Sequence, residues 1–238
     1  MSSPDLSARR PSVVDGASFA VIPGAGSAGL TWAEVAGELG AAVLRAPDEP
    51  TIPAMAAGLD AAVADLPRPR VLIGASMGAM VSLEIARDVE VDALVLIAAG
   101  FGIEVGDRLI EWMVRNPPGI LEKMAKICLA HGGDRTQIEA LVDDYRAGGH
   151  ERHIRQMRAM AAYKPELLAD PPPTLVLWGA LDSAVPLEAH IELALRCGGA
   201  LIPIADAAHV PFFEQPRETL RWIRRAALLA EVRAGSVG

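Results

Sequence analysis

The chain has 238 residues, of which 51% are hydrophobic and 22% are charged. This length fits one or two domains with a full core, and the apolar content excludes an intrinsically disordered protein. The 22 basic and 30 acidic side chains give a net charge of −8. An acidic chain is poorly suited to holding a phosphate backbone, so we expect no nucleic-acid partner.

The N-terminus and the apolar runs give no sign of export or membrane insertion. Residues 1–16 carry Arg9 and Arg10 without an apolar stretch behind them, so they do not resemble a signal peptide. The longest uncharged apolar run, residues 93–103, has about half of the ~20 residues that a spanning helix needs. The two cysteines cannot form a disulfide framework. We therefore expect a cytoplasmic protein without membrane contact.

Short, continuous apolar runs followed by turn residues predict six strands. Continuous hydrophobicity is typical of strands that helices cover on both faces, as in a parallel sheet. The predicted strands are Phe19–Ile22, Ala42–Leu44, Val71–Ile73, Ala93–Ile97, Leu175–Trp178 and Leu201–Ile204. The predicted helices are Thr31–Leu39, Ile52–Leu66, Met77–Arg87, Leu187–Cys197 and a last one from Pro216 to about Val232. This alternation predicts a doubly wound, mainly parallel α/β fold.

One long segment interrupts the alternation. About 70 residues between Gly100 and Pro171 have helical patterns but no convincing strand. An insertion between consecutive parallel strands covers their carboxyl ends, where ligands bind in such folds. We therefore expect a partly mobile lead-in over 1–16, with Val13 and Val14 as a candidate strand, a core domain over 17–100 and 171–238, and a helical cap over 101–170.

The segment Gly74-Ala75-Ser76-Met77-Gly78 joins a predicted strand to a predicted helix. Gly-x-Ser-x-Gly in this position is typical of a sharp turn that lifts a serine hydroxyl above the sheet at a helix N-terminus. Ser76 is therefore a candidate nucleophile. The alternative for the motif taken alone is an ordinary tight turn.

A serine hydroxyl needs a base that removes its proton and an acid that orients the base. Both are expected after later strands, in the order serine, acid, histidine. Asp182 follows the fifth predicted strand, and His209 follows the sixth, 27 residues later. Asp206 is a competing acid, but it is only three residues from His209 and is better placed to cap the local turn.

Developing charge on a substrate oxygen needs two hydrogen-bond donors. One candidate is the backbone N–H of Met77, directly after the candidate nucleophile. The other is the N–H of Ala25, in the glycine-rich loop Pro23-Gly24-Ala25-Gly26-Ser27 after the first strand. The alternative for this loop is a flexible turn without a binding role.

The same loop supports a competing interpretation. Gly24-Ala25-Gly26-Ser27-Ala28-Gly29 matches Gly-x-Gly-x-x-Gly, and Asp48 follows 19 residues after it, which is the spacing of a dinucleotide-binding fingerprint for NAD(P). Three observations oppose it. The helix is predicted to begin only at Thr31, too late to aim well at a pyrophosphate. Neither tyrosine has a lysine four residues later, as a short-chain dehydrogenase requires. The predicted triad would also have no role.

Together these motifs resemble the α/β-hydrolase superfamily over about residues 17–232. The matching segments are PGAGSAGLTW, RAPD, GASMG, WGALDSAVP and AAHVPFFEQP. The resemblance implies that Ser76 is the nucleophile, His209 the base and Asp182 the orienting acid, under a helical cap. One departure is Pro23-Gly24, where many members have His-Gly.

Four aromatic residues are candidates for an apolar substrate pocket: Phe101, Trp112, Phe212 and Phe213. Helix–helix packing is the alternative for each of them. His150 and His153 are three residues apart, but no third ligand lies nearby, so we expect surface histidines and no metal site.

The sequence thus predicts a cofactor-free serine hydrolase. Its expected partner is a small-molecule substrate, an ester, lactone or thioester of a small and largely apolar acyl compound. Two alternatives remain open: a lyase, perhydrolase or biosynthetic enzyme of the same fold that uses the triad as acid and base, and a non-catalytic ligand-binding member.

Overall fold

The computed structural model describes residues 16–103 and 105–236, so the candidate strand at Val13 and Val14 lies outside the described residues. The described chain forms a six-stranded sheet in the order β2-β1-β3-β4-β5-β6, and every neighbouring pair is parallel. The strands are β1 (Ser18–Ile22), β2 (Ala42–Val43), β3 (Arg70–Ala75), β4 (Ala93–Ile97), β5 (Thr174–Gly179) and β6 (Ala200–Ile204). The predicted doubly wound α/β fold is confirmed.

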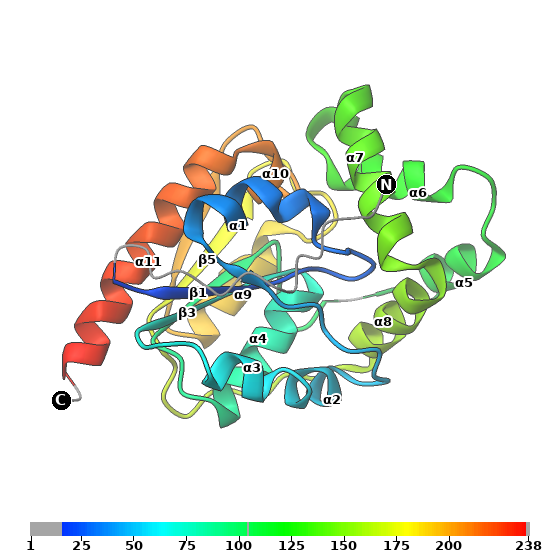
Figure 1. The fold of residues 1–238 in the computed structure, drawn as a ribbon. Helices are drawn as coiled ribbons and strands as arrows, with labels where there is room; N and C mark the ends of the chain where they lie inside the picture. The colour runs from blue at the N-terminus through cyan, green and yellow to red at the C-terminus, as the bar shows by residue number, and fades with distance from the viewer. Residues whose placement is uncertain (1–15, 104, 237–238) are drawn as a thin grey trace, which may run out of the picture.

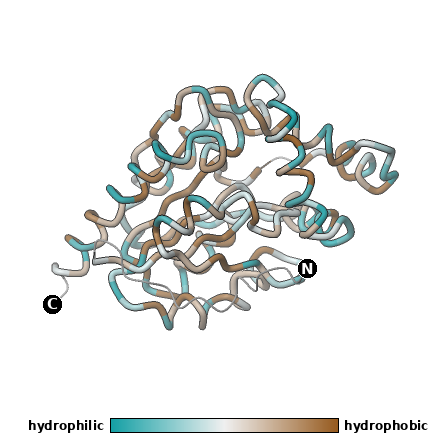
Figure 2. The backbone as a smooth tube through the Cα atoms, turned by 45° about the horizontal axis from the view of Figure 1, so that its top comes forward, coloured by the Kyte–Doolittle hydropathy of each residue, from teal (hydrophilic) through white to brown (hydrophobic). Residues whose placement is uncertain are grey.

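Helices cover both faces of this sheet (Figure 1). One face carries α1 (Ala33–Leu39) and the long C-terminal α11 (Pro216–Ser236), and the other carries α2 (Ile52–Ala57), α3 (Asp60–Ala64) and α4 (Met77–Asp88). Helix α9 (Leu187–Arg196) packs on β5 and β6. Every residue of β1 and β4 is buried, which is why these strands are apolar without alternation. The hydrophobic stretches run through the centre of the molecule in Figure 2.

Four helices between β4 and β5 stand together at one end of the sheet (Figure 1). They are α5 (Asp107–Arg115), α6 (Ile120–Cys128), α7 (Arg135–Gly148) and α8 (His150–Ala162), with the short turn η3 (Ala130–Gly132) after α6. We call this group the inserted helices. No described helix is both long and apolar enough to cross a membrane.

Two predicted helices differ from the structure. The predicted helix Ile52–Leu66 is interrupted at Gly58, which ends α2 and lies so close to Pro47 that a Cβ there would sit 2.6 Å from the proline ring. The predicted helix Thr31–Leu39 begins instead as a tight 3-10 turn, η2 (Leu30–Trp32), that leads into α1. Periodicity is continuous through both segments, so it cannot reveal such local breaks.

The turn between β3 and α4 is shaped by two close approaches. A Cβ on Gly78 would lie 1.9 Å from the carbonyl oxygen of Ile22, and a Cβ on Gly74 would lie 2.3 Å from the carbonyl oxygen of Gly78. Both obstacles are backbone atoms, which cannot rotate away as a side chain does. The two glycines of Gly-x-Ser-x-Gly are therefore required by packing.

We predict opposite effects for two glycine-to-alanine substitutions within helices. Gly78→Ala is expected to lower the free energy of unfolding by about 1–3 kcal/mol or more, because the added methyl overlaps the β1 backbone. Gly37→Ala, in α1, is expected to raise it by roughly 0.5–1 kcal/mol, because nothing lies within 4 Å of the new methyl. Urea unfolding of both variants measures this, and similar values for the two would contradict the packing argument.

Candidate active site

Ser76 occupies the strained turn between β3 and α4. Its backbone has φ 52° and ψ −117°, a conformation that non-glycine residues rarely adopt and that costs about 1–3 kcal/mol. Its N–H donates to the carbonyl of Ile97 on β4 (2.8 Å), and its own carbonyl accepts from Ala79 in α4 (3.0 Å). These bonds on both sides hold the serine at the carboxyl edge of the sheet.

Asp182 and His209 meet at the same edge. The Nδ1 of His209 donates to Oδ2 of Asp182 at 2.9 Å, while Oδ1 accepts from the amides of Ala184 (2.8 Å) and Val185 (3.1 Å). Burial by itself raises the pKa of Asp182, but the hydrogen bond and charge of His209 and these two amides outweigh it, and the pKa lies below its ordinary value. Asp182 is thus an ionised, oriented acceptor, and no hydrogen bond or ion pair joins the competing Asp206 to His209.

The His209 loop is fastened to the inserted helices. The backbone N–H of His209 donates to the carbonyl of Cys128 at the end of α6 (3.0 Å). The carboxylate of Glu214, in α10 (Pro211–Glu214), accepts one bond from Ala208 and one from Ala130, both at 2.7 Å. One carboxylate therefore joins the loop before His209 to the segment after α6.

A cavity of about 170 Å³ lies between the sheet edge and the inserted helices. Ser76, His209 and Ala25 all line it, and most of the other lining residues are apolar: Ile103, Val105, Leu109, Met124, Ile127, Leu141, Met157, Met160, Val185, Val210 and Phe212. Ile127 is 48% exposed, so the cavity opens to solvent beside α6. Ser76 and His209 are not hydrogen-bonded to each other here, as is common before substrate tightens such a pair.

The amides of Ala25 and Met77 form no hydrogen bond among the described residues. Met77 begins α4, so its N–H has no partner within the helix. Ala25 lies in the loop after β1, where the neighbouring Gly26 N–H is already bonded to Oε1 of Gln156 at 2.8 Å. Within this loop Ala25 therefore keeps a donor available where Gly26 does not.

Asp144, on α7, holds the same loop by four hydrogen bonds. Its carboxylate accepts from the amides of Ala28 (2.9 Å) and Leu30 (2.8 Å) and from the hydroxyls of Ser27 (2.7 Å) and Thr31 (3.1 Å). Asp144 is 2% exposed, and all four donors are neutral groups. A buried carboxylate is stable only with such full hydrogen bonding, so α7 and the loop pack as one unit.

These bonds oppose the dinucleotide interpretation. The amides at the end of the glycine-rich loop, which would have to hold a pyrophosphate, already donate to the negative carboxylate of Asp144. Asp48, which would have to hold a ribose, instead pairs with Arg155 on α8, with one bond at 3.0 Å. The described residues also include no group of three or more His, Cys, Asp and Glu side chains that could hold a metal ion.

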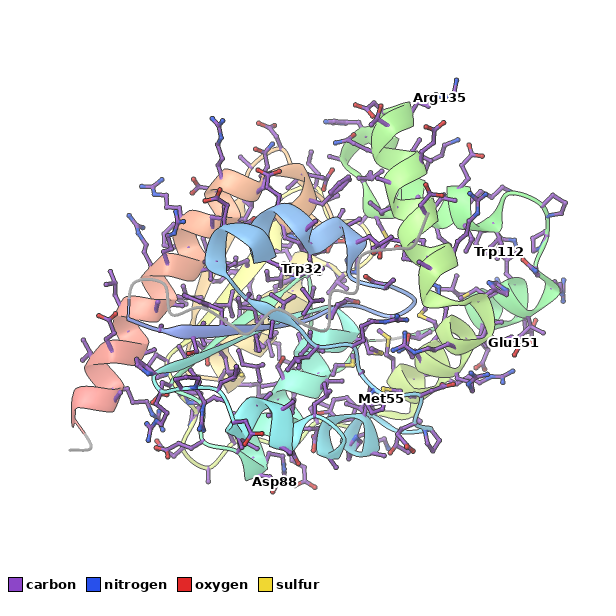
Figure 3. The ribbon with its side chains drawn as sticks, in the orientation of Figure 1. Trp32, Met55, Asp88, Trp112, Arg135 and Glu151 are labelled. Atoms are coloured by element: carbon purple, nitrogen blue, oxygen red, sulfur yellow. The ribbon has the colours of Figure 1, made fainter. Side chains whose placement is uncertain are left out.

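The predicted pocket aromatics lie in different places. Phe212 lines the cavity and stacks on Trp32, with ring centroids 3.7 Å apart. Phe101, Trp112 and Phe213 are half-buried and do not line the cavity. Phe101 lies beneath Arg196, and Trp112 lies on the outer part of the inserted helices beside Lys123 (Figure 3). Their positions in the sequence predict that these three residues lie near the site. The direction in which each side chain points depends on local packing, which the sequence does not show.

The expectation that His153 is a surface histidine is wrong. His153 is 2% exposed and lines the cavity, and its ring lies against Gly26. The sequence does not identify Asp144 and Gln156, because their partners are more than 110 residues away in the chain. The only signal for them in the sequence is a polar residue on the apolar side of a predicted cap helix. Such residues are too common to identify a functional site.

A family model described as "Alpha/beta hydrolase family" matches residues 19–222. The chain belongs to the α/β-hydrolase family. A search of curated protein sequences finds no match.

Among solved structures, the chain of this α/β-hydrolase is similar to a thermophilic esterase from Thermogutta terrifontis at 24% identity, covering 90% of each chain with a TM-score of 0.74. It is similar to an esterase from Exiguobacterium antarcticum at 18% identity, covering 88% of this chain and 91% of that one, with a TM-score of 0.74. It is also similar to the enol-lactonase from Burkholderia xenovorans LB400 at 19% identity, covering 87% and 90%, with a TM-score of 0.73. At these identities the likeness establishes the fold.

We predict that Asp144→Ala loosens the loop after β1. Removal of the carboxylate leaves the amides of Ala28 and Leu30 without an acceptor, and their hydrogen exchange is expected to become at least about 100-fold faster. The matched control is Asp143→Ala, because the neighbouring side chain is 65% exposed and its ion pair with Arg146 lies on the surface. Amide exchange by NMR measures this, and equal rates in the two variants would show that Asp144 does not hold the loop.

We also predict a pH dependence of stability that belongs to His153. Burial, with smaller effects of His150 and Arg152, lowers the pKa of His153 from 6.5 to about 4. The unfolded chain therefore binds a proton at higher pH than the folded chain, so this stability is complete above pH 6.5 and is lost as the pH falls toward 4. The loss is on the order of 3 kcal/mol. Urea unfolding at pH 7, 5.5 and 4.5 should show less acid destabilisation in His153→Leu, and parallel pH profiles would contradict this.

Proposed function

We propose that this protein is a cofactor-free serine hydrolase that cleaves an ester, lactone or thioester of a small acyl compound. The observation that carries the proposal is the 2.9 Å bond between His209 and Asp182 at the rim of a cavity that also contains Ser76 on its strained turn. A base with a buried, ionised partner is what an unactivated hydroxyl needs in order to react.

In the proposed reaction, Ser76 Oγ attacks the carbonyl carbon while Nε2 of His209 takes the hydroxyl proton. The negative oxygen of the tetrahedral intermediate faces the amides of Ala25 and Met77, which are preorganised and free to donate. The intermediate collapses to an acyl-enzyme, and His209 passes the proton to the leaving alcohol or thiol. Water, deprotonated by His209, then releases the acid and restores Ser76. Asp182 stabilises the imidazolium in both halves.

The cavity supports a small, mainly apolar acyl group. Its volume of about 170 Å³ is close to that of an apolar cavity that holds one benzene ring, on the order of 150 Å³. Helices α7 and α8, whose lining residues are buried, close one side of the cavity, whereas the side at Ile127 on α6 is open. We propose that the acyl group occupies the closed side and that the leaving group points to solvent, so that selectivity is greater for the acyl part.

The deciding experiment is covalent labelling with a fluorophosphonate, read by intact mass and peptide mapping. We expect one adduct on Ser76, and none in Ser76→Ala. A panel of p-nitrophenyl esters from acetate to dodecanoate should give the highest kcat/KM at about four to six acyl carbons, since the whole cavity has about the volume that holds one six-carbon ring. Absence of labelling in a folded protein would reject an activated serine.

Non-hydrolytic use of the same triad is the remaining candidate, because the bond between His209 and Asp182 serves acid–base chemistry equally well. Substitution of Ser76 separates the two. In the proposed hydrolase, Ser76→Ala is expected to lower kcat by at least about 10⁴-fold, because the acyl-enzyme cannot form. Activity that persists in this variant would favour a lyase or related enzyme in which the serine is not the nucleophile.

A further inference from the structure

A buried histidine in the cavity wall lacks a hydrogen-bond partner. His153, on α8, lines the cavity and is 2% exposed, and its ring lies 5.2 Å from that of Tyr145. Its Nδ1 is fully buried without a hydrogen-bond partner, and Nε2 forms no hydrogen bond among the described residues. The other polar groups that the inserted helices bring to this wall are engaged: Tyr145 contacts Sγ of Cys128 at 3.4 Å. Buried polar groups in native proteins are nearly always paired, so this exception calls for a ligand.

The packing around His153 orients its ring. A Cβ on Gly26 would lie 2.2 Å from Nδ1, 2.3 Å from Cγ and 2.5 Å from Cε1. Because these three distances are nearly equal, the backbone of the loop after β1 packs on the face of the ring beside Nδ1. Nδ1 is inaccessible and has no acceptor. Nε2 is not among the fully buried atoms that lack a partner, so it is the ring nitrogen left for the cavity that His153 lines.

The same packing selects the tautomer. An orphaned buried N–H is rarer in proteins than an orphaned lone pair, so the single proton of the neutral ring belongs on Nε2 and not on Nδ1. Burial keeps the ring neutral, since the pKa of His153 is lowered to about 4. His153 therefore presents one N–H donor to a largely apolar wall.

We propose that His153 donates this hydrogen bond to an oxygen carried by the acyl part of the substrate. The substrate class is thus an ester, lactone or thioester whose small acyl group bears an ether, carbonyl or hydroxyl oxygen beyond the scissile carbonyl, and not a plain alkanoate. This deepens the proposed hydrolase function and rests on it. A binding site that offers a buried donor discriminates strongly against an analogue that lacks the acceptor, because the donor then stays unpaired.

The first test compares isosteric esters. In p-nitrophenyl 3-methoxypropanoate an oxygen replaces one methylene of p-nitrophenyl pentanoate, and p-nitrophenyl ethoxyacetate moves that oxygen by one position. After division by the hydroxide-catalysed rates, kcat/KM is expected to be at least about tenfold higher for one oxygen-bearing ester than for the pentanoate. His153→Leu should bring this ratio below about twofold, and His153→Gln, which keeps a donor near Nε2, should restore part of it. The control His131→Asn, at an exposed histidine in η3, should leave the ratio unchanged.

Two outcomes overturn the proposal: a ratio near one in the unsubstituted enzyme, or an unchanged ratio in His153→Leu. A ratio near one would mean that the ring N–H of His153 donates to water or has no acceptor at all.

A second measurement does not depend on turnover. In ¹⁵N-histidine-labelled protein, we expect His153 as the Nε2–H tautomer, with a resonance that shifts on addition of 4-methoxybutan-2-one and not of its isostere hexan-2-one. The opposite tautomer, or equal responses to the two ketones, would reject the proposal even if no ester were cleaved. Failure of fluorophosphonate labelling together with a selective shift would reject hydrolysis and retain the acyl-oxygen site.

Discussion

The buried carboxylate of Asp144 is the interaction on which the rest of the site depends. It lies on α7, outside the sheet and its covering helices, and its four hydrogen bonds all go to one loop after β1. A carboxylate removed from water is destabilising by several kcal/mol unless its oxygens are saturated with donors. In the conformation seen here, the loop presents all four donors to this one carboxylate. The position of α7 and the shape of the loop therefore determine each other.

Other contacts extend this coupling around the cavity. Gln156 binds the amide of Gly26, and a Cβ on Gly148 would lie 1.8 Å from the Gly26 carbonyl oxygen, so the inserted helices approach the loop as closely as backbone allows. On the other side, Glu214 and the carbonyl of Cys128 hold the loop that carries His209. The inserted helices are thus fastened to both loops that the proposed mechanism uses. Preorganisation of donors and base in this manner is what lets a hydrolase stabilise charge without rearrangement during the reaction.

The chemistry proposed here uses few polar groups in a largely apolar cavity. Ser76 stores backbone strain at the end of β3, Asp182 stays ionised because His209 and two amides offset its burial, and Nδ1 of His153 is buried without a hydrogen-bond partner. Each of these is a local departure from the stable arrangement of a protein interior. Such departures concentrate at functional sites, because the surrounding packing is what maintains them.

The sequence alone determined the strands, the order of the candidate catalytic residues at the strand ends, and the turn at Ser76. These features depend on local signals, namely continuous apolar runs and a Gly-x-Ser-x-Gly segment. The positions of Ser76, Asp182 and His209 follow as well, because parallel strands bring their carboxyl ends to one edge of the sheet. The aromatic pocket was predicted less well: Phe212 lines the cavity, but Phe101, Trp112 and Phe213 do not.

Only the tertiary structure decided the partners of the inserted helices. The contacts of Asp144 and Gln156 with the loop after β1 span 113 to 130 residues, and the burial of His153 follows from them. Helical periodicity shows that a face is buried but carries no information on what covers it, because each face is defined by the docking of the whole helix and not by its neighbours in the chain.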